Sequence, residues 1–116
     1  MTDVFNATRG CLLAERVEKA DGFSARLFGL MGRASPGPQA AMWLIPCRMI
    51  HTCFMRFSLD VVFLDRDQKA VRVLRGLLPW RLSPWVRGAR SALEFESGAL
   101  SGRVAEGDQL EFRDGK

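Results

Sequence analysis

The stretch that decides the fold reads His51-Thr-Cys-Phe-Met-Arg-Phe-Ser-Leu-Asp-Val-Val-Phe-Leu-Asp65. It places a histidine, a thiol, an arginine and two carboxylic acids within a run of apolar residues typical of a protein core. A buried polar group loses its hydration, so each of these side chains needs a hydrogen-bond or charge partner. The stretch therefore predicts a central strand with specific polar contacts, although it indicates no particular reaction.

Alternation within this stretch predicts a half-buried strand. The odd positions from Cys53 to Phe63 are apolar and share one face, whereas Arg56 and Asp60 lie on the other face. Arg56 and Asp60 would be about 13 Å apart in a straight strand, so each needs a partner on another strand. We expect Arg56 to pair with Glu94, or Asp60 to accept backbone N–H bonds at a kink.

Outside this stretch the sequence reads as short strands separated by turns. Alternation and turn residues predict strands around Phe5 and at 11–17, 41–45, 70–74, 92–96 and 109–112. A short helix is expected over 24–31, ending at Gly32. About seven short strands with one short helix predict a mostly β fold, a compact antiparallel β barrel or sandwich. We expect a single domain over 1–116.

The composition is that of an ordinary soluble globular protein, with 116 residues of which 47% are hydrophobic and 26% charged. The three cysteines are an odd set without regular spacing, and the first residues carry neither a basic region nor a long apolar region. We therefore expect a reducing, cytoplasmic location. No apolar run approaches the ~20 residues needed to cross a bilayer, so we expect no membrane span.

One segment of the chain is strongly basic. Between Gln68 and Leu93 there is no acidic residue. The cations in this segment are Lys69, Arg72, Arg75, Arg81, Arg87 and Arg90. The segment also contains Trp80 and Trp85, and the proline before each places both rings in a loop, where they favour contact with a partner. The alternative is that the rings cover one end of the barrel and the arginines are ordinary solvated charges.

Four motifs occur in order along the chain. They are Gly-Leu-Met-Gly-Arg at 29–33, Phe-Met-Arg-Phe at 54–57 with Asp-Val-Val-Phe-Leu-Asp at 60–65, Leu-Glu-Phe-Glu-Ser-Gly at 93–98, and Gly-Asp at 107–108. Through this set, and over most of its length, the chain resembles the domain of unknown function 192 family. The resemblance implies a small, single, β-rich domain and no established activity.

The chain departs from the pattern of that family at two places. It has Ser58 where the family usually has proline before the Leu-Asp pair, and Ala-Met-Trp-Leu at 41–44 where a Gly-Met-Leu-Phe-like strand is usual. The first difference leaves open whether the chain bends before Asp60. A bulge there would reset the side-chain alternation and turn Asp60 inward.

Cys47, His51 and Cys53 have a spacing that superficially suggests a zinc site. His51 and Cys53 share a strand face, but Cys47 lies beyond Pro46 and there is no further histidine to complete four ligands. We therefore expect no metal and no cofactor, and we interpret both cysteines as small buried residues. A small enzyme that uses His51 with Asp60 or with a cysteine remains an alternative.

Three functions remain open. The first is a non-catalytic binding module that contacts a small anionic ligand or a protein partner, as a monomer or a weak homodimer. Its expected binding residues are His51, Arg56, Asp60, Trp80, Arg81, Trp85 and Arg87. The second is the small enzyme, and the third is a nucleic-acid binder that uses the arginines and tryptophans of 72–90. The modest net charge of +4 argues against nucleic acid.

Overall fold

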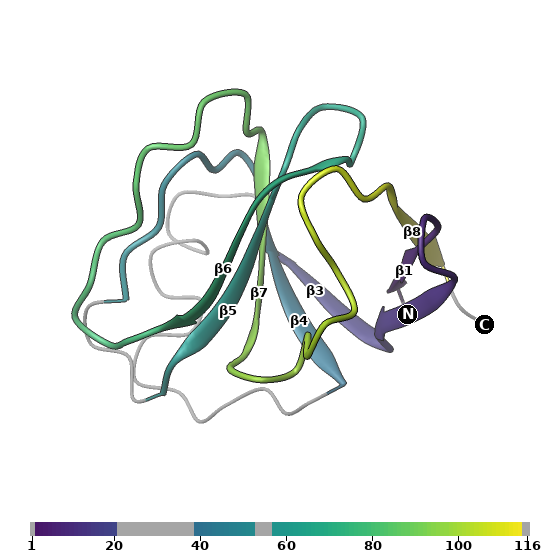
Figure 1. The fold of residues 1–116 in the computed structure, drawn as a ribbon, viewed down its shortest axis with the longest axis horizontal. Helices are drawn as coiled ribbons and strands as arrows, with labels where there is room; N and C mark the ends of the chain where they lie inside the picture. The colour runs from purple at the N-terminus through teal and green to yellow at the C-terminus, as the bar shows by residue number, and fades with distance from the viewer. Residues whose placement is uncertain (1, 21–38, 53–56, 115–116) are drawn as a thin grey trace.

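Within residues 2–20, 39–52 and 57–114, which the computed structural model describes, the chain forms eight strands (Figure 1). The strands are β1 (Thr2–Asn6), β2 (Cys11–Ala14), β3 (Arg16–Ala20), β4 (Ala40–Leu44), β5 (Leu59–Leu64), β6 (Ala70–Leu77), β7 (Ser91–Glu96) and β8 (Leu110–Asp114). The mostly β fold predicted from the sequence is confirmed. The short helix expected over 24–31 falls outside the described residues.

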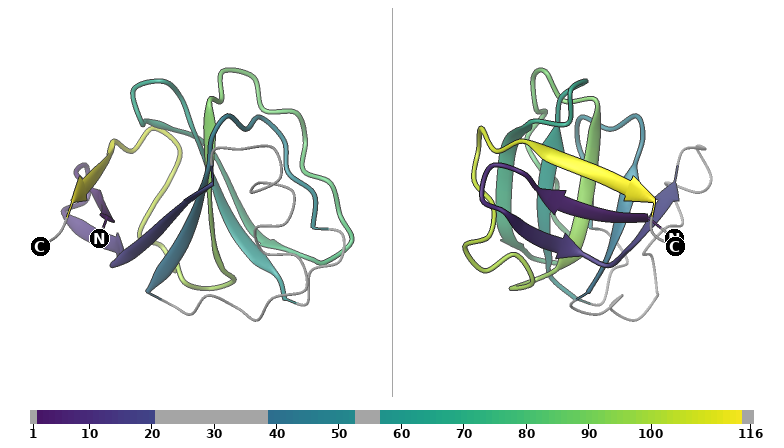
Figure 2. Two further views of the ribbon diagram at one scale, coloured as in Figure 1. Left: turned by 180° about the vertical axis from the view of Figure 1, so that it is seen from behind. Right: turned by 90° about the vertical axis from the view of Figure 1, so that its right-hand side faces the viewer.

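The strands form two sheets packed against each other. One sheet has the order β2-β1-β8 and the other has the order β3-β4-β7-β5-β6. In the right-hand view of Figure 2, the strands of the smaller sheet run across those of the larger one. The architecture is therefore a sandwich of crossed sheets. Every pair of described strands is antiparallel except β3–β4, in which Val17 lies opposite Ala41.

The strand predicted over 11–17 is two strands in the structure, because the chain changes sheet at Glu15. Before this residue β2 pairs with β1, and after it β3 pairs with β4. The backbone N–H groups of Glu15 and Arg16 both donate to the carbonyl of Gln39, at 2.8 and 3.2 Å. This corner joins the two sheets and adds one strand to the number expected.

The prediction of a half-buried strand is wrong for β5, because all six of its side chains are buried. The even residues Val62 and Leu64 pack into the core between the two sheets. The odd residues from Leu59 to Phe63 pack into a second core on the opposite face. A strand that is buried on both faces needs a covering layer on each side.

Residues 46–52 and 78–90 cover the second core, on the face of β5 opposite the smaller sheet. We call these two segments the loop layer. Figure 1 shows these two segments running together at the left of the molecule. Their backbone N–H groups donate across the layer from Cys47 to Arg90, from Val86 to Arg48, from Ser83 to Ile50 and from Thr52 to Arg81, at 2.8 to 2.9 Å. Ile50, Val86 and Ala89 turn inward and pack into the second core with the odd residues of β5.

Asp60 carries the carboxylate of β5, and both of its oxygens accept hydrogen bonds. One accepts from the backbone N–H of Gly76 on β6 at 2.9 Å, and the other from that of Gly98, after β7, at 3.0 Å. This confirms the expectation that Asp60 accepts backbone N–H bonds, and the pairing of β5 with β6 shifts register at the same point. Gly76 and Gly98 have φ of 66° and 90°, which glycine adopts without steric cost. The carboxylate thus links β5, β6 and the turn after β7.

Replacing Asp60 with asparagine is expected to lower the free energy of unfolding by about 3 kcal/mol. The change removes the negative charge and points an NH₂ group at one of the two backbone donors. Urea unfolding followed by circular dichroism measures the effect. Asp67→Asn, in the exposed turn after β5, is the matched control and is expected to change stability by less than about 0.5 kcal/mol. Equal stability of Asp60→Asn and the parent would contradict the structural role of this carboxylate.

Candidate functional site

All five large apolar side chains that are exposed among the described residues belong to the loop layer. Trp80 is 57% exposed and Trp85 is 67% exposed. The other three are Met49, Leu78 and Leu82. We call these five residues the aromatic rim. Trp80 also has φ of 62°, a left-handed conformation that is uncommon for a bulky residue and that clusters at functional sites.

Hydrogen bonds of buried polar residues in the loop layer determine which side chains of the layer point inward and which point into solvent. The buried hydroxyl of Thr52 donates to the carbonyl of Leu78 at 2.5 Å and accepts from the N–H of Arg81 at 2.8 Å. The hydroxyl of Ser83, also buried, accepts from the N–H of Ile50 at 2.9 Å. Because these groups occupy the inner side of the layer, the large apolar side chains between them project into solvent.

The aromatic rim lies in a positively charged part of the surface. Its flanking cations are Arg48, Arg81, Arg87 and Arg90, all exposed. Neither segment of the loop layer contains an aspartate or a glutamate. An excess of cations over acids creates a positive potential that attracts carboxylates.

An open groove crosses the aromatic rim between Met49 and Trp85. It has a volume of about 680 Å³ and is lined by Pro46, Cys47, Arg48, Met49, Trp85 and Arg90. An indole ring, a thioether and two guanidinium groups thus face one space. Such a surface can bury an apolar side chain and pair a neighbouring carboxylate.

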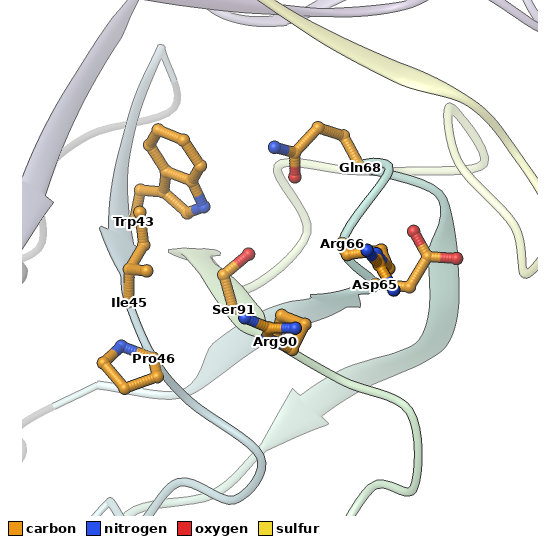
Figure 3. A pocket seen from close by; sticks show the side chains of 8 residues that line it. All are labelled: Trp43, Ile45, Pro46, Asp65, Arg66, Gln68, Arg90 and Ser91. Atoms are coloured by element: carbon orange, nitrogen blue, oxygen red, sulfur yellow. The ribbon is translucent and has the colours of Figure 1, made fainter.

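A smaller cavity of about 250 Å³, which is also open to solvent, lies next to the groove, at the end of the five-stranded sheet (Figure 3). The cavity shares Pro46 and Arg90 with the groove. Its other polar lining residues are Trp43, Asp65, Arg66, Gln68 and Ser91. Trp43 comes from β4, Ser91 begins β7, and the remaining three lie in or beside the β5–β6 turn.

His51 lies in the loop layer, paired by an isolated β-bridge with Leu82. Its Nδ1 atom is buried and has no hydrogen-bond partner within the part of the chain that is described. Within the described residues no hydrogen bond or ion pair joins His51 to Asp60, whose two oxygens accept from the backbone N–H groups of Gly76 and Gly98. Arg56, the remaining expected binding residue near this point, falls outside the described residues.

Of the expected binding residues, four lie exposed on the loop layer, namely Trp80, Arg81, Trp85 and Arg87, and their role in binding stays a prediction. Asp60 lies apart from them, inside the scaffold. Six other residues that line these two spaces were not singled out as site residues from the sequence, namely Trp43, Arg48, Met49, Arg66, Gln68 and Ser91. In the sequence, Arg90 was noted only as one of the cations of the basic segment, without a predicted binding role.

The described residues contain neither a candidate metal site nor a candidate membrane-spanning helix. They contain no group of three or more histidine, cysteine, aspartate or glutamate side chains placed to hold a metal ion. A helix long and apolar enough to cross a membrane is likewise absent from the ranges that the structure describes.

The family model of domain of unknown function 192 (DUF192, Uncharacterized ACR) matches residues 4–112. The chain belongs to the DUF192 family. It is 33% identical over 115 residues to a UPF0127 protein of Pyrococcus abyssi, with 94% of this chain and 96% of that protein covered. A UPF0127 protein of Thermococcus sibiricus is 33% identical over 116 residues, which cover 94% of this chain and 73% of the relative.

Two solved structures share the DUF192 fold seen here. A protein of unknown function from Novosphingobium aromaticivorans DSM 12444 has a TM-score of 0.81 at 20% identity, with 95% of this chain and 82% of that chain covered. A protein from Sinorhizobium meliloti 1021, proposed to be a transcription regulator, has a TM-score of 0.78 at 24% identity, with 96% and 91% covered. At these identities the likeness shows the fold alone.

Glu94 of this DUF192 chain is a buried acid in the second core. It lies on β7 opposite Met42 of β4 and Val61 of β5, and both neighbours belong to that core. Burial away from water raises the pKa of its carboxyl group from 4.5 to about 8, so the group is mostly neutral at pH 7. The pairing with Arg56 expected from the sequence involves a residue outside the described ranges and stays a prediction.

Replacing Glu94 with glutamine is expected to stabilise the fold at pH 7 by about 3 kcal/mol. An acid whose pKa is raised by folding opposes folding at pH values above its unfolded pKa of 4.5, and the penalty grows until pH reaches about 8. Glutamine keeps the shape without the charge. Urea unfolding of both proteins across this pH range should give a difference below about 0.5 kcal/mol at the acidic end that widens as pH rises. A difference that does not change with pH would contradict the raised pKa.

Proposed function

We propose that this DUF192 domain is a non-catalytic protein-binding module whose aromatic rim docks a partner segment carrying apolar side chains beside carboxylates. The observation that carries the proposal is the gathering on the loop layer of all five exposed large apolar side chains of the described residues. Covering apolar surface that is exposed to water lowers the free energy, so these side chains favour binding of a partner. Tryptophan and arginine, which are enriched in binding hot spots, are both present there.

The two tryptophans supply most of the expected affinity. Trp80 and Trp85 each keep more than half of their surface exposed. Covering one such ring contributes on the order of 3 kcal/mol, at ~25 cal/mol for each Å² of apolar surface removed from water. The backbone that carries the rings is already fixed by hydrogen bonds to residues 46–52, so little further conformational entropy is lost on binding.

The arginines select the partner. Four of them surround the aromatic rim, and no acid lies in either segment of the loop layer. A partner with carboxylates at the edge of its apolar surface complements this charge and associates faster than a neutral one. Two copies of this chain placed rim to rim would instead oppose arginine to arginine. The charge therefore favours a different, acidic protein and a domain that is itself monomeric.

We also propose that the domain is one unit over 1–116 and that it acts in the cytoplasm. The thiol of Cys11 donates to the carbonyl of Arg103 at 3.6 Å, and the thiol of Cys47 donates to that of Met49 at 3.3 Å. Neither thiol takes part in a disulfide, which is what a reducing compartment such as the cytoplasm favours.

Synthetic peptides that alternate leucine or phenylalanine with aspartate or glutamate test the proposal, beside matched peptides in which lysine replaces each acid. Binding is followed by tryptophan fluorescence, because covering Trp80 or Trp85 moves its emission to shorter wavelength. We expect the acidic peptides to bind and the basic ones not to bind. Trp85→Ala should weaken binding at least about tenfold. Arg87→Glu should weaken binding of the acidic peptides and improve that of the basic ones.

Arg16→Glu makes the same charge change on β3, outside the loop layer, and is expected to leave peptide binding unchanged. Thermal unfolding verifies that each variant is folded. No shift of tryptophan emission with any acidic peptide would overturn the proposal. Binding of single-stranded DNA that Arg87→Glu abolishes would replace it with nucleic-acid binding, and self-association that Trp85→Ala abolishes would replace the acidic partner with a second copy of this chain.

A further inference from the structure

We propose that the cavity between the end of β4 and the start of β7 is a binding site for a small carboxylate, distinct from the aromatic rim. Two hydrogen-bonding atoms at this cavity, Nε1 of Trp43 and Oγ of Ser91, are buried and have no hydrogen-bond partner within the described ranges. A buried polar atom left without a partner costs about 1–3 kcal/mol. Two such atoms at one cavity indicate that something other than the described side chains satisfies them.

Figure 3 shows how these groups are arranged. The indole nitrogen of Trp43, the hydroxyl of Ser91 and the side-chain amide of Gln68 point toward one another across the centre of the cavity. Trp43 can only donate, whereas serine and glutamine can each donate a hydrogen bond. Because the indole N–H can only donate, a ligand beside it must offer an acceptor oxygen, which the serine hydroxyl and the glutamine amide can also bind.

The donor of Trp43 is held in place by packing outside the cavity. The indole stacks on the ring of Phe112 with 3.8 Å between centroids and an interplanar angle of 17°. On the same indole, the ammonium group of Lys19 lies 5.7 Å from the ring centroid. Ser91 is only 3% exposed, at the start of β7. A donor that does not need to be ordered on binding gives more of its interaction energy to the ligand.

The charges around the cavity favour a ligand with one negative charge. Arg66 and Arg90 supply two cations, and Asp65 supplies one carboxylate. One oxygen of Asp65 accepts the backbone N–H groups of Asp67 and Lys69, at 2.8 and 3.0 Å, so this acid is held by the turn. Its repulsion disfavours a doubly charged phosphate more than a carboxylate. The volume of about 250 Å³ suits a carboxylate carrying few other atoms.

Acetate, N-acetylglycine and acetamide are the probes for this site. Acetate represents a free small acid, N-acetylglycine represents the carboxyl end of a peptide, and acetamide has the same shape as acetate without the charge. The chain has three tryptophans, so nuclear magnetic resonance can follow three indole N–H signals during titration at constant ionic strength. We expect either carboxylate to move the Trp43 signal downfield in a saturable way, while the signals of Trp80 and Trp85 stay in place. Acetamide is expected to act at least about tenfold more weakly.

Two variants test whether the proposed donors bind the ligand. Trp43→Phe keeps a ring to stack on Phe112 but removes the N–H, and Ser91→Ala removes the hydroxyl. Each is expected to weaken acetate binding about tenfold, read from the backbone amide signals of residues 90 and 91. Ser97→Ala, at an exposed position after the other end of β7, is the matched control and is expected to leave binding unchanged.

The outcomes separate this site from the aromatic rim. Trp85→Ala should leave acetate binding intact, and Trp43→Phe should leave binding of the acidic peptides intact. A Trp43 indole signal that neither carboxylate moves would overturn the site, with water alone filling the cavity. Equal effects of acetamide and acetate would overturn the choice of a carboxylate. Binding of N-acetylglycine without acetate would support a peptide terminus as the source of that carboxylate.

Discussion

The burial of β5 on both faces is the constraint on which the rest of the structure depends. The sheet β2-β1-β8 covers one face of this strand and the loop layer covers the other. The carboxylate of Asp60 is tolerated inside this arrangement because two backbone N–H groups bond to it. Both candidate sites lie on exposed parts of this arrangement. The aromatic rim is on the outer surface of the loop layer, and the cavity beside Trp43 is at the end of the five-stranded sheet.

The two sites differ in the kind of recognition that they support. The aromatic rim is wide, apolar and edged by arginines, which suits a segment of another protein. The cavity beside Trp43 is small and presents hydrogen-bond donors, which suits a compact polar group. Arg90 and Pro46 line both spaces, so one guanidinium group lies where the two sites meet.

Turn residues and alternation are local properties, and they predicted most strands correctly. They gave the wrong burial for β5, which they predicted to be half-buried. Asp60 stands among apolar residues at the even positions of this strand, and no local feature shows that both faces are covered. Trp80 and Trp85 could be recognised because the prolines before them exclude a helix. Met49 could not, since only the long-range pairing within the loop layer brings it beside Trp85. Trp43 reads as an ordinary strand residue until β4 is placed beside the start of β7.

The smaller sheet joins segments that are far apart in the sequence, because β1 pairs with β8. The amide of Asn6 also donates to the carboxylate of Asp108, which lies 102 positions later. The β1–β2 hairpin is synthesised before β8, so Val4 and Leu13, which are fully buried in the folded protein, have no complete core to enter until β8 has been translated. The smaller sheet therefore cannot finish folding before its last strand has left the ribosome.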